Sequence, residues 1–566
     1  MTNIDPNMHV RLLKQEFLLQ QSNYDKVINK NFNILREDGE LYFAQYVGFD
    51  DVRGNIILKF SLNNPFPRKG EELLALIPDN KHNNPTKCNG VKYIQILKTA
   101  QRSTNIRPIW YRQEEDNRIL IGFGGCTPEF LSDLPINIPI ILGPGTPPTE
   151  YLKNLIYLLE NKELYPRFKE IVELDIEEEG WKPELLSNNE DVALMLSAEL
   201  QICRDMVIQG PPGTGKSYLI AKLCDLFLKQ NKKVLISSLT NKALTEIVEK
   251  EGLQHHLVNG KIYKSSLSVD EKKKYPSLKS GGDYQLKSGT VLLSSYYNLS
   301  DLACKNTGSI FDVVIVEEGS QAFLSTIGAA RHLGGTFILV GDQNQLAPIR
   351  MITNQDLEHL NLQKAFEGFS TFGNYFSKAN KYLLNQSYRL NEYSIDLTNV
   401  FYNNLLVSAG IDNGFVQFPA EYTDSNSVIL KTLKMPDGIK APQNAIGSMI
   451  DDLKAFYHKN PKSSFAVLAF HKASVKSLQT HIIEKMGFRN NILVETIDRV
   501  QGLTVDFCFF FVPNTGLGFS LEAKRFNVAT SRAIHFTGIF VPDGLNLNDF
   551  DDNVKAYFVK LIKEQN

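Results

Sequence analysis

The residues best suited to do chemistry lie between positions 210 and 217, in the run Gly-Pro-Pro-Gly-Thr-Gly-Lys-Ser. This run fits the GxxxxGK[ST] pattern of phosphate-binding loops, in which glycines let backbone N–H groups surround phosphate oxygens. Lys216 supplies a positive charge for the β and γ phosphates, and Ser217 supplies a hydroxyl ligand for Mg²⁺. An apolar strand precedes the loop and a helix follows it, which is the context that the pattern requires. The predicted nucleotide-binding residues are Gly210, Pro211, Gly213, Thr214, Gly215, Lys216 and Ser217.

Two adjacent carboxylates form a second candidate site. Glu317 and Glu318 end the apolar run at 313–316. This is the layout of a Walker B strand, in which the first acid holds Mg²⁺ and the second orients or deprotonates water. We therefore predict that Glu317, with Ser217, binds Mg²⁺ and that Glu318 is catalytic.

Short apolar runs of buried-strand type position these residues. One series covers 206–208, 234–237, 291–294, 313–316 and 337–340, and a second covers 464–469, 492–496 and 507–512. Alternation of such strands with helices predicts an α/β protein with two tandem parallel-sheet domains, at 181–380 and 381–566. Upstream, the patterns predict a helix within 1–35, a small β-barrel at 36–145, and helices with a Gly/Pro-rich linker at 146–180.

Composition narrows the class of protein. With 566 residues, 43% hydrophobic and 22% charged, the chain is neither collagen-like nor wholly disordered. We find no apolar run long enough to span a membrane and no secretory signal, and the six cysteines form no CxxC pair. These features predict a cytoplasmic protein without membrane contact. A net charge of −2 means that any nucleic acid binds in a local groove, not through the overall charge.

An ordered series of motifs resembles those of superfamily 1B helicases, in the branch of the nonsense-mediated-decay helicase and its relatives. After the phosphate loop these motifs lie at 239–243, 317–321, 340–348, 384–389, 495–502 and 525–533. The resemblance implies two RecA-like domains preceded by a helical stalk and an accessory barrel. It also implies an ATP-dependent helicase or translocase that moves 5′ to 3′ on single-stranded DNA or RNA.

The same resemblance assigns roles to individual residues. Gln345 would sense the γ-phosphate or the attacking water, and Arg389 and Arg532 would be arginine fingers, so these join Lys216 and Glu318 as catalytic residues. Tyr388 and Gly502 would contact the nucleotide. Sequence-independent contacts to single-stranded or forked DNA or RNA would come from Thr240, Asn241, Ser295, Lys472 and Thr496.

Three positions depart from the family pattern. Glu317 replaces an aspartate, Glu190 replaces the glutamine that holds adenine, and Thr504 replaces a glutamate. Two other functions therefore stay open: a nucleic-acid-stimulated NTPase that does not unwind, and a degenerate ATP-binding switch or scaffold. We found neither a nuclease nor a zinc motif, which predicts that a partner protein supplies further activities. The sequence leaves the oligomeric state open.

Overall fold

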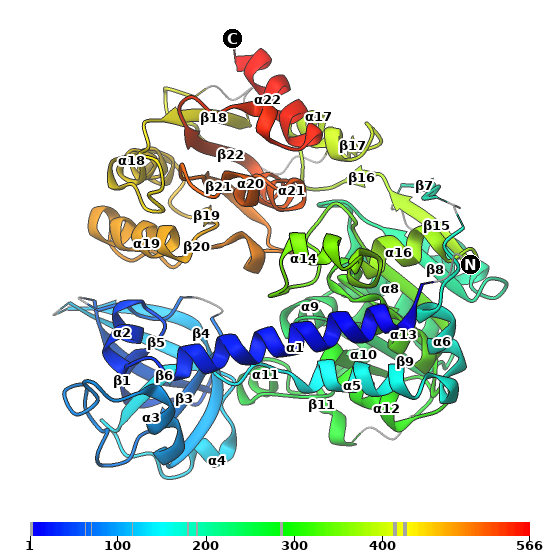
Figure 1. The fold of residues 1–566 in the computed structure, drawn as a ribbon, viewed down its shortest axis with the longest axis horizontal. Helices are drawn as coiled ribbons and strands as arrows, with labels where there is room; N and C mark the ends of the chain where they lie inside the picture. The colour runs from blue at the N-terminus through cyan, green and yellow to red at the C-terminus, as the bar shows by residue number, and fades with distance from the viewer. Residues whose placement is uncertain are drawn as a thin grey trace.

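The structure, a computed structural model, describes residues 4–62, 64–68, 71–115, 117–177, 180–187, 191–283, 287–410, 416–422 and 427–565. Its strands form a closed barrel, a nine-stranded sheet, a five-stranded sheet and a two-stranded pair. We call the units around the two large sheets the first and second α/β domains. In Figure 1 the second α/β domain lies above both the barrel and the first α/β domain.

The long N-terminal helix lies along the first α/β domain. Helix α1 (Pro6–Ile28) begins with proline at its first position, and the Asp5 side chain accepts the Asn7 N–H at 2.9 Å. Helix α1 runs beside α5 (Glu150–Glu160), where Leu12 and Leu13 are buried (Figure 1). Helix α2 (Phe32–Glu37) crosses the predicted boundary after residue 35. The helical pattern at 150–174 is interrupted before Pro166, which begins α6 (Pro166–Val172).

The barrel is antiparallel, and its strands follow the order β1-β2-β5-β4-β3-β6. Alternation along β2 buries Ile56, Leu58 and Phe60 in the barrel core. The strands are β1 (Tyr42–Asp50), β2 (Asn55–Ser61), β3 (Leu73–Ile77), β4 (Arg102–Glu114), β5 (Arg118–Gly124) and β6 (Pro139–Gly143).

The first α/β domain has its phosphate-loop strand inside the sheet. The order is β11-β10-β12-β9-β13-β14-β8-β15-β7, and strands β8, β9, β12, β13 and β14 fall on the five predicted runs. The bounds are β7 (Glu184–Leu186), β8 (Asp205–Gln209), β9 (Val234–Ser238), β10 (Ile262–Lys264), β11 (Lys279–Ser280), β12 (Val291–Ser295), β13 (Phe311–Val316), β14 (Gly334–Gly341) and β15 (Ala379–Leu384).

The predicted domain boundary after residue 380 is wrong. Strand β15 pairs in parallel with β8, so it belongs to the first sheet, and the crossing to the second domain begins at Asn385. An apolar run shows that a strand is buried, but it does not show which of two sheets the strand joins.

The second sheet is also parallel, in the order β18-β22-β21-β19-β20. Its strands are β18 (Val428–Leu433), β19 (Phe465–Ala469), β20 (Ile492–Thr496), β21 (Val505–Phe511) and β22 (Ala533–Pro542). The sequence patterns did not predict β18 and β22. Helices α18 (Gln443–Lys459) and α19 (Lys472–Met486) pack together beside this sheet, with Phe456 and Leu478 in its core (Figure 1).

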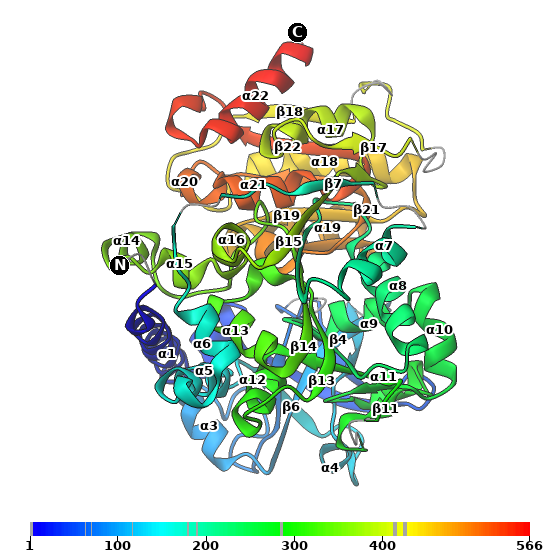
Figure 2. The same ribbon diagram turned by 90° about the vertical axis from the view of Figure 1, so that its right-hand side faces the viewer.

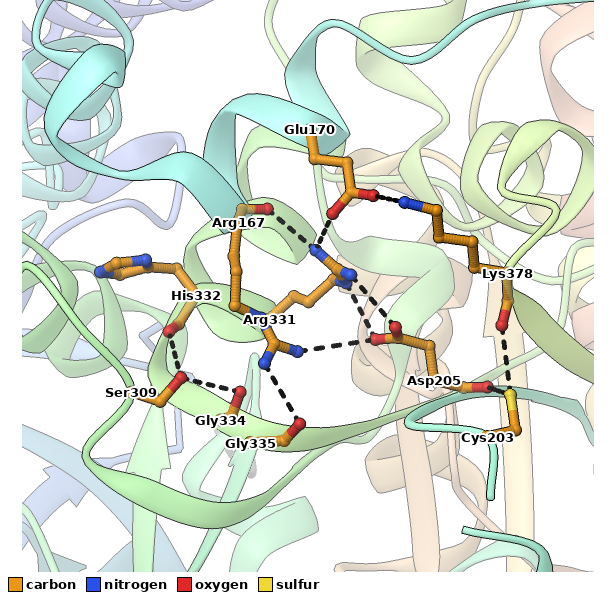
Figure 3. A network of polar contacts seen from close by, with 10 residues as sticks. All are labelled: Arg167, Glu170, Cys203, Asp205, Ser309, Arg331, His332, Gly334, Gly335 and Lys378. Carbon is orange, nitrogen blue, oxygen red and sulfur yellow. Dashed lines mark hydrogen bonds and ion pairs between the residues drawn. The ribbon is translucent and has the colours of Figure 1, made fainter. Parts of the chain in front are cut away.

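A buried ionic network holds Asp205, the first residue of the phosphate-loop strand β8 (Figure 3). Arg331, on α13 (Leu324–Leu333), contacts both carboxylate oxygens of Asp205, at 2.8 and 3.1 Å. Its Nη1 donates to Glu170 of α6 at 2.8 Å, and Lys378 also pairs with Glu170. The network thus joins β8, through α13, to α6, which lies beside α13 (Figure 2). In the described part of the chain, no helix is long and apolar enough to cross a membrane.

Candidate nucleotide and nucleic-acid sites

The phosphate loop joins β8 to α8 (Lys216–Lys229) and depends on glycines. Gly213 has φ +76°, in the left-handed region that favours glycine. A Cβ at Gly213 would lie 2.5 Å from the Arg389 Cβ and 2.7 Å from the Ser387 Oγ. The loop therefore needs glycine both for its backbone shape and for the close approach of the segment that follows β15.

This segment, residues 385–389, runs directly over the phosphate loop. The Tyr388 N–H donates to the Gly213 carbonyl at 2.8 Å, and the Ser387 hydroxyl donates to the Pro212 carbonyl at 3.0 Å. The Tyr388 side chain is 36% exposed. The chain thus reaches the second α/β domain by passing across the phosphate loop, which brings Tyr388 and Arg389 close to that loop.

The two carboxylates lie at the end of β13, beside the loop. Glu317, which stands where the family has aspartate, accepts the Ser217 hydroxyl at 2.7 Å. Its second oxygen, Oε2, is buried without a hydrogen-bond partner. Mg²⁺ prefers oxygen ligands. The Ser217 hydroxyl and the Glu317 carboxylate, with its unpaired Oε2, supply such oxygens, so these residues fit the predicted ion.

The neighbouring Glu318 adopts an unusual backbone conformation. Its φ is +52°, which is strained for a residue with a Cβ and is typical of functional positions. Its carboxylate accepts the Ser238 hydroxyl at 3.4 Å. A Cβ on Gly502, of the second α/β domain, would lie 3.8 Å from the Glu318 Oε1. Gly502 therefore lies at the carboxylates, where residues of both α/β domains meet.

Three cations lie near these groups: Arg532 is buried, and Lys216 and Arg389 are partly buried. Burial lowers the pKa of Lys216 to about 8, of Arg389 to about 9 and of Arg532 to about 10. Arg389 and Arg532 each lower the pKa of Lys216 further through like-charge repulsion. Burial raises the pKa of Glu317 and Glu318, and the charge of Glu318 raises that of Glu317 further. A polyanion such as a nucleoside triphosphate would relieve the repulsion among the cations.

The two arginines are held by the second α/β domain. Arg532 is 1% exposed, and its guanidinium donates to the carbonyls of Val528 at 2.7 Å and Leu503 at 3.3 Å. Arg389 donates to the Ser531 carbonyl at 3.0 Å and to the Thr504 hydroxyl. Thr504, one of the three departures, therefore contacts a predicted arginine finger. Another departure, Glu190, lies outside the described residues.

Asp342, to which the sequence assigned no role, connects the two α/β domains through a series of hydrogen bonds. Its carboxylate accepts from Gln209 at 3.0 Å, from the predicted sensor Gln345 at 2.8 Å and from the Tyr402 hydroxyl at 2.6 Å. Asn527 of the second domain donates to the same hydroxyl at 2.9 Å. The sequence signal that could have identified Asp342 was an aspartate directly after Gly341, at the end of an apolar strand.

The predicted nucleic-acid contacts all follow parallel strands. Thr240 caps the helix after β9, with Asn241 as its first residue, and Ser295 caps the helix after β12. Lys472 begins α19 after β19, and Thr496 ends β20. Because β9 pairs with β12 and β19 with β20, the structure brings these residues together in two groups, one on each sheet.

Two family models match the chain, both described as an AAA domain, at residues 199–350 and 365–540. The DNA replication ATP-dependent helicase/nuclease DNA2 of Saccharomyces cerevisiae is 30% identical over 148 residues, which is 25% of this chain and 10% of the yeast protein. Its Schizosaccharomyces pombe counterpart is 26% identical over 385 residues, 58% of this chain and 26% of that protein.

These matches support a superfamily 1 P-loop helicase. An uncharacterized ATP-dependent helicase of Methanocaldococcus jannaschii is 24% identical over 39% of this chain and 34% of its own length. The chain thus spans between about a tenth and a third of these three relatives. Among solved structures, an arterivirus nonstructural protein 10 helicase aligns over 86% of this chain and 79% of its own, with 13% identity and a TM-score of 0.36.

Proposed function

We propose that this protein is an ATP-dependent helicase of superfamily 1B that translocates 5′ to 3′ on single-stranded DNA or RNA. The observation that carries the proposal is the nucleotide site shared between domains: residues 387–389 contact the phosphate loop, while Asp342 and Asn527 both bond to Tyr402. Because both α/β domains contribute to one site, nucleotide binding and release change how they fit together. The ordered motifs and the helicase relatives support the same function.

The roles of the residues follow from their positions. Lys216 neutralises the β and γ phosphates, and Ser217 and Glu317 hold Mg²⁺, which supplies charge neutralisation for phosphoryl transfer. Glu318 accepts a proton from the attacking water or orients it, and Gln345, which donates to Asp342, senses the γ-phosphate or that water. Arg389 and Arg532 stabilise the transition-state charge, a contribution worth about 10³–10⁵ in rate for an arginine finger.

Translocation needs contacts in both domains. Thr240, Asn241 and Ser295 on the first domain, and Lys472 and Thr496 on the second, bind phosphates without reading sequence. Such contacts serve a forked substrate equally well, and a partner protein supplies any further activity. The cytoplasmic location predicted from the sequence stays a prediction.

ATP turnover without polymer, with single-stranded RNA and with single-stranded DNA tests the proposal, followed by unwinding of a forked duplex. Lys216→Ala removes the phosphate contact, and Lys229→Ala is its control, because Lys229 ends the same helix and pairs with Asp225 at 2.8 Å. We expect polymer-stimulated turnover that Lys216→Ala abolishes and Lys229→Ala retains. Stimulation without unwinding would favour the remodelling NTPase. Tight ATP binding with no turnover would refute the motor and favour the switch.

A further inference from the structure

The barrel contacts both α/β domains. On the first domain, Arg107 of β4 pairs with Asp270 at 3.2 Å and with Glu271 at 3.7 Å. Asp270 also accepts the Gly125 N–H at 2.9 Å, and Glu271 pairs with the buried Lys264 at 3.1 Å. These acids lie on α11 (Val269–Lys274), in the segment between β10 and β11. The barrel is therefore held on the first domain by a partly buried ionic network.

The contact with the second domain is built differently. Arg68 of the barrel donates to Glu495 Oε1 at 3.0 Å, and the two side chains are 12% and 3% exposed. The Tyr111 ring lies 5.1 Å from the Phe488 ring, and the Phe488 N–H donates to Gln113 at 3.3 Å. This ion pair, ring contact and hydrogen bond all lie on or next to β20.

Carboxylates bind both predicted polymer contacts of the second domain. The Glu495 oxygen that accepts from Arg68 also accepts the Thr496 N–H at 2.7 Å and the Thr496 hydroxyl at 3.2 Å. Glu40, just before β1 of the barrel, pairs with Lys472 at 3.9 Å. An N–H, a hydroxyl, a guanidinium and an ammonium are the donors that a phosphodiester also uses. Glu495 and Glu40 therefore compete with a polymer for the same groups.

The two carboxylates are satisfied to different degrees. Oε2 of Glu495 is buried without a hydrogen-bond partner, whereas Oε2 of Glu40, also without a hydrogen bond, pairs with Lys30 at 4.0 Å. A buried unpaired carboxylate oxygen is costly, so an arrangement that exposes it to water regains free energy. The Glu495 contact is thus suited to open when another anion takes its donors.

We infer that the barrel and the second α/β domain form an autoinhibitory latch, made of Arg68, Glu495 and Thr496 together with Glu40 and Lys472. Phosphates of single-stranded nucleic acid displace Glu495 and Glu40 from Thr496 and Lys472, and the second domain then separates from the barrel, which stays on the first domain. The polymer thereby frees the second domain to move during ATP turnover. This inference rests on the proposed function and names how its polymer site is regulated.

Glu495→Gln and Glu40→Gln test the latch, because each removes one negative charge and keeps the side-chain shape. We expect each to tighten binding of single-stranded polymer and to raise polymer-free ATP turnover, by about fivefold or more for the pair combined. Glu114→Gln is the control, since Glu114 is a barrel carboxylate that pairs with Arg112 at 3.4 Å on the exposed surface. Equal values for the double variant and the control would overturn the latch.

Hydrogen exchange of the wild-type chain separates a latch from a simple gain of positive charge. On adding polymer, we expect faster exchange at the Phe488 amide, which donates to Gln113, while the Gly125 amide on Asp270 stays protected. If polymer stimulates turnover but exchange at the Phe488 amide is unchanged or slower, the latch is overturned and the proposed function stands. A wild-type chain that neither binds polymer nor responds to it overturns the proposed function and the latch together.

Discussion

Gly213→Ala tests whether the close contact between the phosphate loop and the 385–389 segment sets the rate of ATP turnover. The added Cβ would lie 2.5 Å from the Arg389 Cβ, and ordinary van der Waals contact begins at 3.4 Å. Arg389 or the loop must therefore move by about 1 Å, and a misplacement of about 1 Å near a reacting group costs about 10² in rate. The left-handed backbone adds about 1–2 kcal/mol of destabilisation.

The control is Gly438→Ala in the second α/β domain. Gly438 has φ +74°, close to the value at Gly213, but a Cβ there meets nothing within 4 Å. Both variants should lose about 1–2 kcal/mol of unfolding free energy from the backbone, and Gly213→Ala more because of the clash. Only Gly213→Ala should lose about 10² in kcat for ATP, measured as phosphate release at saturating polymer. A Gly213→Ala enzyme within about threefold of the control, in the same assay, would refute the reasoning.

Three further predictions concern buried polar groups. Tyr402→Phe removes the hydroxyl that donates to Asp342 at 2.6 Å, a loss of about 1–3 kcal/mol at a buried carboxylate, so kcat should fall about tenfold in the phosphate-release assay while the fold persists. Arg331→Met takes two short contacts from the buried Asp205 and leaves it the longer contact with Arg167 at 3.9 Å, so urea unfolding should show a loss of about 3 kcal/mol, which adding Asp205→Asn should partly restore. Burial lowers the pKa of His9 to about 4, so between pH 6.5 and 4 the unfolded chain takes up a proton that the folded chain does not. The unfolding free energy should therefore fall as the pH drops through this window, by about 3 kcal/mol in all, and His9→Leu should remove that part of the pH dependence.

The sequence predicted the elements that carry strong local signals. Glycine spacing and a lysine identify a phosphate loop from residue types alone, and long apolar runs identify central strands such as β8 and β13. Strand β15 shows the limit of this reasoning. Its run Ala-Asn-Lys-Tyr-Leu-Leu is interrupted by Asn380 and Lys381, and its pairing with β8 is a long-range choice that no local pattern encodes.

The residues of the candidate site also divide into those with a local sequence signal and those without one. Lys216, Ser217 and the two glutamates were predictable because each has a fixed place next to a strand. Asp342 and Tyr402 gained importance only through contact with residues far along the chain, such as Asn527. The Arg68–Glu495 pair joins positions 427 residues apart, so only the folded structure brings these residues together.

Two sets of charged contacts, one in the nucleotide site and one at the barrel, both involve the second α/β domain. In the nucleotide site, Arg389 and Arg532 repel Lys216, and a triphosphate removes that repulsion and draws the two α/β domains together. At the barrel, the Arg68–Glu495 pair holds the second domain by an attraction that polymer phosphates weaken. A ligand shifts a conformational equilibrium only by its difference in affinity for the two states. On the proposed function and the proposed latch, ATP and polymer both favour a second domain that has left the barrel and closed on the first, so each raises the affinity for the other by the same factor.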